Sequence, residues 1–248
     1  MTNHPERHKY GTEANRPIRR DLERINQASH SHDRPYSWGL TIFRTVYTSE
    51  SNDSFPQAVE SLHALANEYA LGELSLKRGR LEPPLDPAPN EALAKRFYCD
   101  VIQDKSVLDG VGPDTVGELF DAWVMEHNHD KGRRLPECAD FGRSVGRFEF
   151  CIMLDQQGID HLLQMKIPLR LQMRRCGQLY VKVVAAVKRQ DLGEHGQVDG
   201  HETGRLWLRA GLGIPIIRLC IGLIDVDASL DELGLPDQVD GILNYFMF

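Results

Sequence analysis

A β-strand is predicted by the stretch WGLTIFRTVYT, which runs from Trp38 to Thr48. Its apolar residues alternate with the period of two that places every second side chain on the same face of a strand. The face defined in this way carries Trp38, Leu40, Ile42 and Val46. Arg44 falls on the same face, so a guanidinium is expected among apolar side chains.

A buried guanidinium needs a partner for its charge, and two hypotheses follow for Arg44. In the first, Arg44 forms an ion pair with an acidic residue on a neighbouring strand, Asp100 or Glu149. In the second, it anchors a carboxylate or another anion in a pocket beside the sheet, because the guanidinium fork binds such groups well. The sequence favours the ion pair and leaves the anchor open.

The sequence predicts two strand–helix–strand units, and the first of them begins with this stretch. The first has strands at 38–48 and 97–103 around a helix at 54–71, which Asp53 or Ser54 caps and which has Pro56 in its first turn. The second has strands at 147–154 and 178–187 around a helix at 155–165, which Asp155 caps. A further helix with Val116, Phe120, Trp123 and Val124 on one side is inserted between the units.

Two βαβ halves with alternating strands predict an α+β fold of the ferredoxin-like kind. Such a fold has a mainly antiparallel sheet with helices on one face. The competing topology is a parallel, doubly wound α/β sheet, which needs strands that are apolar on both faces. The predicted strands mostly alternate, so the α+β fold is the preferred prediction.

Residues 1–35 are expected to form a polar tail, followed by a single domain at 36–248. One short helix is predicted within the tail, because Pro17 suits a first helical turn. Ile18, Leu22 and Ile25 have helical spacing, so this helix is expected to dock on the domain or on a partner.

Composition excludes several classes of protein. The net charge of −7 argues against non-specific binding to nucleic acid or to an anionic membrane, and the Arg-rich segment 170–178 lacks the interleaved aromatic residues that stack on bases. Five widely spaced cysteines, no CxxC pair and no apolar leader indicate a cytoplasmic protein. The apolar segment 206–224 contains Arg209, Arg218 and Pro215, so it is predicted to be a buried element of the fold instead of a membrane helix.

Two histidine-containing segments are weak candidates for a metal site. The first is EHNHD, with His127 and His129, which a helix end does not hold in a fixed geometry. The second is the glycine-rich loop 193–204, with His195 and His201, which lacks the HExxH pattern. We assign no metal from these patterns, although metal binding by either histidine pair stays open.

Catalytic signatures are missing elsewhere in the sequence. There is no GxSxG elbow and no phosphate-binding GxxxxGK[ST] loop, and the glycine-containing LDGVGPD and RAGLGIP segments do not complete GxGxxG. Cys99 and Cys151 lie within predicted strands, where inert buried thiols are usual. We therefore expect no cofactor.

The strand carrying Phe43, Arg44 and Thr45, the DSFPQAVESL helix and the later FEFCIMLD strand, which ends in Asp155, together resemble a group of uncharacterised intracellular proteins of filamentous ascomycete fungi. The resemblance covers the central part of the chain. It implies a fungal source and an intracellular location, and it implies no activity, because that group has none assigned.

The preferred functional hypothesis is an intracellular α+β domain that binds a small molecule or a partner protein. The candidate ligand-binding residues are Arg44, Tyr47, Tyr98 and His201. The alternative is a cofactor-independent enzyme of the dimeric α+β-barrel kind that acts on a small organic substrate such as a secondary metabolite, which would make the protein a homodimer. An apolar pocket would favour the enzyme, and an exposed apolar patch at 18–25 or 245–248 would favour the interaction protein.

Overall fold

The computed structural model describes residues 17–28, 36–75, 85–127, 142–143, 145–165, 179–186, 207–222, 238–239 and 242–243. The α-helices are α2 (Pro17–Ala28), α3 (Ser49–Leu71), α4 (Ala88–Lys95), α5 (Lys105–Leu108), α6 (Pro113–His127), α7 (Gln156–Gln164) and α8 (Ile214–Gly222). The strands are β1 (Tyr36–Arg44), β2 (Phe97–Ile102), β3 (Gly142–Arg143), β4 (Phe150–Leu154), β5 (Tyr180–Ala185), β6 (Trp207–Gly211), β7 (Gln238–Val239) and β8 (Ile242–Leu243). Two short 3-10 helices are described, η1 (Gly72–Ser75) and η3 (Val145–Phe148).

The predicted strand at 38–48 exists as β1, but it ends four residues early, at Arg44. The chain then turns into α3, which begins at Ser49 because Thr48 caps it. The Thr48 hydroxyl oxygen accepts a hydrogen bond from the Ser51 backbone N–H at 3.0 Å. The predicted caps, Asp53 and Ser54, are therefore inside the helix, and Pro56 lies beyond the first turn.

The second unit follows the prediction more closely. The Asp155 carboxylate caps α7 by accepting from the Gly158 backbone N–H at 2.9 Å. The same carboxylate accepts from the Lys182 ammonium on β5 at 2.6 Å, which joins β5 to the start of α7. The inserted helix exists as α6, and a further helix, α4, precedes β2.

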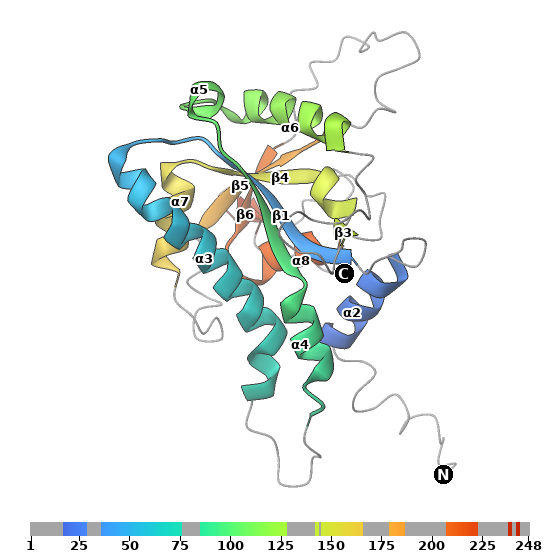
Figure 1. The fold of residues 1–248 in the computed structure, drawn as a ribbon. Coiled ribbons are helices and arrows are strands. Elements are labelled where there is room, and N and C mark those ends of the chain that lie inside the picture. The colour runs from blue at the N-terminus through green and yellow to red at the C-terminus, as the bar shows by residue number, and fades with distance from the viewer. Residues whose placement is uncertain are drawn as a thin grey trace, which may run out of the picture.

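The main sheet has the strand order β2-β1-β4-β5-β6, which short β8 and β7 continue, while β3 pairs with β1. β1 is parallel to both of its long neighbours, β2 and β4, whereas the β4–β5 and β5–β6 pairs are antiparallel. The protein is therefore an α+β protein with a mixed sheet. The helices cover both faces, with α5 and α6 on one side and α3, α4 and α7 on the other (Figure 1).

The ferredoxin-like arrangement is not confirmed. In that fold another strand would separate β1 from β2, whereas here the two are direct parallel neighbours from Trp38 opposite Phe97 to Phe43 opposite Ile102. Helices cover both faces of the sheet, which the prediction confined to one face. The physical reason is that β1 is buried along its whole length, so both of its faces need a covering layer.

The larger core fills the sheet face that carries Trp38, Leu40 and Ile42, under α3, α4, α7 and α8. α2 docks here as predicted, because Ile18 and Ile25 are buried in this core. The smaller core, on the opposite face, lies between β1, β4, β5 and the helices α5 and α6.

The described part of the apolar segment at 206–224, residues 207–222, forms β6 and α8, which Gly213 joins at a φ of 125°. Both elements contribute to the larger core, as Ala210 and Ile217 illustrate. This confirms that the segment is a buried element of the fold. None of the helices in the described ranges has the length and apolar character needed to cross a membrane.

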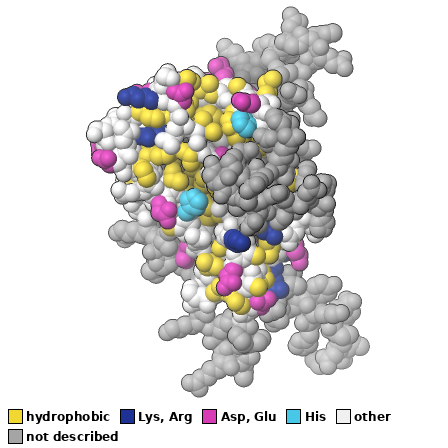
Figure 2. Space-filling view, viewed as in Figure 1, with side chains coloured by type: hydrophobic (Ala, Val, Ile, Leu, Met, Phe, Trp, Pro, Cys, Tyr) yellow, Lys and Arg dark blue, Asp and Glu magenta, His cyan; other side chains and the backbone are white. Residues whose placement is uncertain are grey.

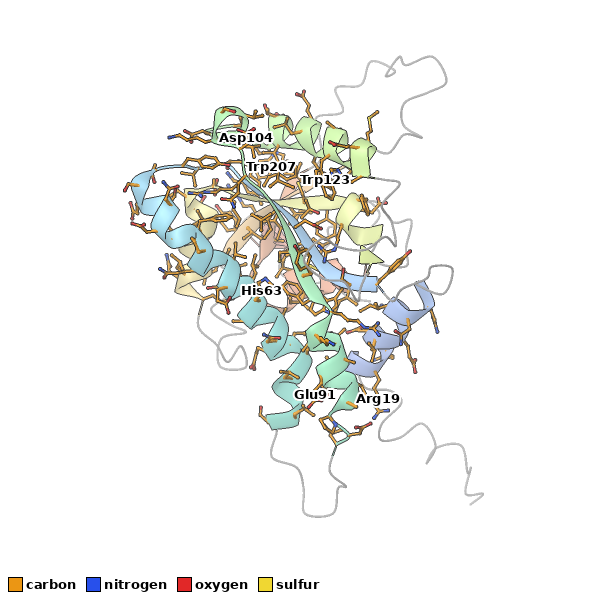
Figure 3. The ribbon with its side chains drawn as sticks, viewed as in Figure 1. Arg19, His63, Glu91, Asp104, Trp123 and Trp207 are labelled. Atoms are coloured by element: carbon orange, nitrogen blue, oxygen red, sulfur yellow. The ribbon has the colours of Figure 1, made fainter. Side chains whose placement is uncertain are left out.

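His63 makes stability depend on pH. It is on α3, and the centre of its ring lies 5.1 Å from that of Phe97 on β2 (Figure 3). Burial lowers the His63 pKa from its usual 6.5, and Glu60 opposes this only in part. Below about pH 6.5 the unfolded chain therefore binds more protons than the folded one, and stability falls as pH falls.

Thermal unfolding midpoints of the wild type and of His63→Gln at pH 7.5 and pH 5.5 test this. We expect the wild type to lose more stability than the variant on acidification, because glutamine cannot take up the proton. Equal losses in the two proteins would show that His63 does not carry the effect.

Candidate functional site

The candidate site lies at the carboxyl ends of the parallel strands β1 and β2. β1 leads into α3 on one face of the sheet, and β2 leads into α5 and α6 on the other face. Adjacent parallel strands whose connections leave toward opposite faces form a topological switch point, where open α/β sheets bind their ligands. Figure 3 shows Asp104, which follows β2, at the same end of the sheet as the start of α3.

Arg44, the last residue of β1, is at the centre of this site and is 6% exposed. Its Nε donates to the Val46 carbonyl oxygen at 2.9 Å, and its Nη1 donates to Gln103 Oε1 at 3.1 Å. Its Nη2 donates to Ser51 Oγ at 3.3 Å and to Asn52 Oδ1. Arg44 therefore ties the end of β1 to the end of β2 and to the first turn of α3.

All four acceptors of Arg44 are neutral. The predicted ion pair with Asp100 or Glu149 is thus wrong, since no carboxylate in the described part of the chain accepts a hydrogen bond from Arg44. The physical reason for Asp100 is that it lies on the opposite sheet face, in register with Thr41. The positive end of the α3 dipole adds to the charge of Arg44, which has no hydrogen bond to a carboxylate within the described residues.

Aromatic rings enclose the guanidinium. The ring centres of Tyr47 and Phe55 lie 4.5 Å and 4.7 Å from the central carbon of the Arg44 guanidinium. The Tyr47 hydroxyl oxygen is buried near the Asp104 backbone, yet it does not reach hydrogen-bonding geometry with any described group. Burial raises the Tyr47 pKa, so this hydroxyl keeps its proton well into the alkaline range.

A second buried arginine lies on the other face of β1. Arg147, in η3, is fully buried and its Nη1 lies 2.7 Å from Asp100 Oδ2. Its Nη2 donates to Ser37 Oγ at 3.2 Å and to the backbone carbonyl oxygens of Trp38 and Tyr98 at 3.3 Å and 2.6 Å. This cluster fastens η3 to β1 and β2, and its donors already have protein acceptors, except Nε.

The structure brings together two of the four predicted ligand-binding residues. Arg44 and Tyr47 are in contact, as predicted. Tyr98 is on the opposite face of β2, where its ring lies 5.3 Å from the Arg147 guanidinium. His201 lies outside the described residues.

The metal candidates gain no support. His127 stacks on Trp123 with ring centres 4.7 Å apart, and its Nδ1 lies 2.9 Å from the Trp123 carbonyl oxygen, which is a helix-end contact. Within the described residues no group of three or more His, Cys, Asp or Glu side chains is placed to hold a metal ion. His129, His195 and His201 lie outside those residues.

No family model matches the chain, and no curated protein or solved structure is measurably similar to it. The function is therefore argued from the chemistry of the site alone. The resemblance to fungal proteins stays a prediction.

Sequence reasoning missed Gln103, Asn52 and Ser51 as partners of Arg44, and it missed Arg147 entirely. Period-two alternation contained a signal for the second cluster, because Asp100 interrupts the apolar β2 sequence on the face opposite to Cys99. An inward aspartate needs a cation, and the basic residue next to the apolar strand at 148–154 is Arg147. No comparable signal identifies amides, which occur throughout the surface.

Proposed function

We propose that this protein binds a small anionic organic ligand at the carboxyl ends of β1 and β2, with Arg44 as the anchor. The observation that carries the proposal is the buried Arg44 guanidinium with neutral acceptors alone, beside the first turn of α3. A buried cation without a counter-charge is costly, and a bound anion recovers part of that cost. The topological switch point is an independent reason to expect a ligand there.

Binding is a better proposal than catalysis. The groups that touch Arg44 are two amides, a hydroxyl, a backbone carbonyl and two aromatic rings. None of these groups is a strong base at neutral pH, so they suit recognition of a ligand more than proton transfer.

A small ligand is also a better proposal than a partner protein. The apolar face of α2 would have favoured a partner had it been exposed, but Ile18 and Ile25 are buried within this chain. The second candidate for an exposed apolar patch, residues 245–248, lies outside the described residues. In the view of Figure 2, Lys and Arg side chains of the described residues are scattered, which gives no support for a nucleic-acid surface.

Calorimetric titration of the full chain with acetate, benzoate, inorganic phosphate and sulfate tests this proposal. We expect at least one of these anions to bind saturably. Arg44→Met should weaken that binding about ten- to a hundred-fold, the usual loss for a hydrogen bond to a charged group. Arg209→Met is the matched control, because Arg209 also stacks on a tyrosine, Tyr180, at 5.0 Å.

The control should keep wild-type affinity. Unchanged binding in folded Arg44→Met would refute Arg44 as the anchor, and no saturable binding of any anion in the panel would refute the function. Arg44→Met should itself fold, because Gln103 and Asn52 are exposed and can bond to water, while the buried Ser51 hydroxyl keeps its hydrogen bonds to the Val46 and Thr48 carbonyl oxygens.

A further inference from the structure

The donors at the Arg44 site fit a particular class of anion, an inference that rests on the proposed function. A guanidinium has five N–H groups, and four hydrogen bonds use four of those on Arg44. The remaining N–H is on Nη1, the nitrogen that Gln103 shares. Because the N–H groups on Nε and Nη2 all have acceptors among the described residues, a ligand would reach the charge through Nη1.

The second donor is the Tyr47 hydroxyl. Its oxygen is buried beside the Asp104 backbone, and no described group accepts a hydrogen bond from its O–H. Its ring lies against the Arg44 guanidinium, so the two donors belong to one site. A buried hydroxyl without an acceptor is unfavourable, and an anion that accepts from it removes that penalty.

The amides beside Arg44 add adaptable donors. Gln103 and Asn52 present their oxygen atoms to the guanidinium. Each amide also has an NH₂ group, which can donate to a bound anion while the amide oxygen stays on the guanidinium. The donor set therefore consists of one cation and several neutral groups.

Two acidic residues act on this donor set, and two more flank its members in the sequence, which limits the charge that the site tolerates. Asp104 and Asp109 act electrostatically on Tyr47, and Glu50 and Asp53 flank Ser51 and Asn52 in the sequence of α3. The basic residue closest in sequence on this rim is the exposed Lys105 at the start of α5. A dianion such as phosphate would meet more repulsion from these carboxylates than a monoanion would.

We propose that the Arg44 site takes a monocarboxylate, with one oxygen accepting from Arg44 Nη1 and the other from the Tyr47 hydroxyl. A planar carboxylate has two acceptor oxygens on one carbon, which matches two donors from adjacent side chains. The organic part of the ligand then points away from the guanidinium, toward the space outside the strand ends.

Titration of the full chain with acetate and benzoate, with phosphate, and with the neutral isostere acetamide tests the assignment. We expect a carboxylate to bind at least about ten-fold more tightly than phosphate or acetamide. Tyr47→Phe should weaken carboxylate binding about ten-fold while it preserves the ring against Arg44. Tyr180→Phe is the matched control, because Tyr180 also stacks on an arginine.

The outcomes separate this inference from the proposed function. Phosphate binding more tightly than the carboxylates, or unchanged carboxylate affinity in Tyr47→Phe, would overturn the monocarboxylate assignment and leave anion binding by Arg44 standing. Absence of binding by every anion would overturn both.

Discussion

Replacing Gly39 with alanine is expected to destabilise the protein by more than about 4 kcal/mol, at the extreme of what single substitutions do. Gly39 has a φ of +141°, which side-chain-bearing residues rarely adopt. A Cβ atom there would lie 1.9 Å from the Tyr98 carbonyl oxygen on β2. Backbone atoms cannot move aside as a flexible side chain can, so β1 and β2 would have to separate.

Alanine substitutions at two other glycines distinguish the two causes of this loss of stability, which are backbone strain and the steric clash of the Cβ atom. Gly110 has a positive φ of +75° with no atom within 4 Å of an added Cβ, so Gly110→Ala should cost about 1 kcal/mol from backbone strain alone. Gly112 has neither feature, so Gly112→Ala should be within about 0.5 kcal/mol of the wild type.

Urea unfolding followed by circular dichroism measures the three variants on one scale. For Gly39→Ala, loss of the folded signal before any urea is added counts as the expected result. A cost for Gly39→Ala equal to that of Gly110→Ala would show that the contact with Tyr98 is relieved at little cost, contrary to our expectation.

Arg147→Met is expected to cost about 3–5 kcal/mol, because it leaves the Asp100 carboxylate buried without its cation. Arg147 is fully buried, and its Nη1 lies 2.7 Å from Asp100 Oδ2. The substitution also removes two hydrogen bonds to backbone carbonyl oxygens next to Gly39. One is to Trp38, which precedes Gly39, and the other is to Tyr98, which lies opposite Gly39 on β2. Arg147 therefore stabilises the same part of the β1–β2 pair in which Gly39 lets the two backbones approach each other closely.

A double-mutant cycle tests whether the loss of the ion pair with Asp100 is the main cause of the lower stability of Arg147→Met. Asp100→Leu in the Arg147→Met background should recover at least about 1 kcal/mol, because neither charge is then buried alone. Arg19→Met is the control: its pair with Asp86 is 3.7 Å long and partly exposed, so its loss should cost less than about 1 kcal/mol. Additive effects at Arg147 and Asp100 would contradict the proposed coupling.

Local pattern was sufficient to predict most of the described elements. Period-two alternation identified β1, β2, β4 and β5, and capping by Asp155 located α7. The start of α3 was predicted five residues late, because both Thr48 and the later Asp53 or Ser54 are good caps in sequence. The choice between them depended on where β1 ends, which is a property of the sheet.

Sheet order was harder to predict, because alternation does not report which strands are neighbours. An alternating strand indicates one buried face, whereas β1 is buried on both because α5 and α6 cover the face that carries Phe43. Small and polar residues on that face, such as Ser37, Gly39 and Thr41, looked like a solvated surface. In the structure they accommodate Arg147 and its partners.

The sequence by itself determined that Arg44 is on an apolar strand face, that Tyr47 lies near it, and that α2 docks through Ile18 and Ile25, while it left open whether α2 docks on this domain or on a partner. These follow from local periodicity, which reports how a segment meets its immediate surroundings. Only the tertiary structure decided that Asp100 pairs with Arg147 and that Arg44 has neutral hydrogen-bond acceptors among the described residues. Partner choice depends on register and on the sheet face across segments far apart in the chain, and local pattern carries no information about either.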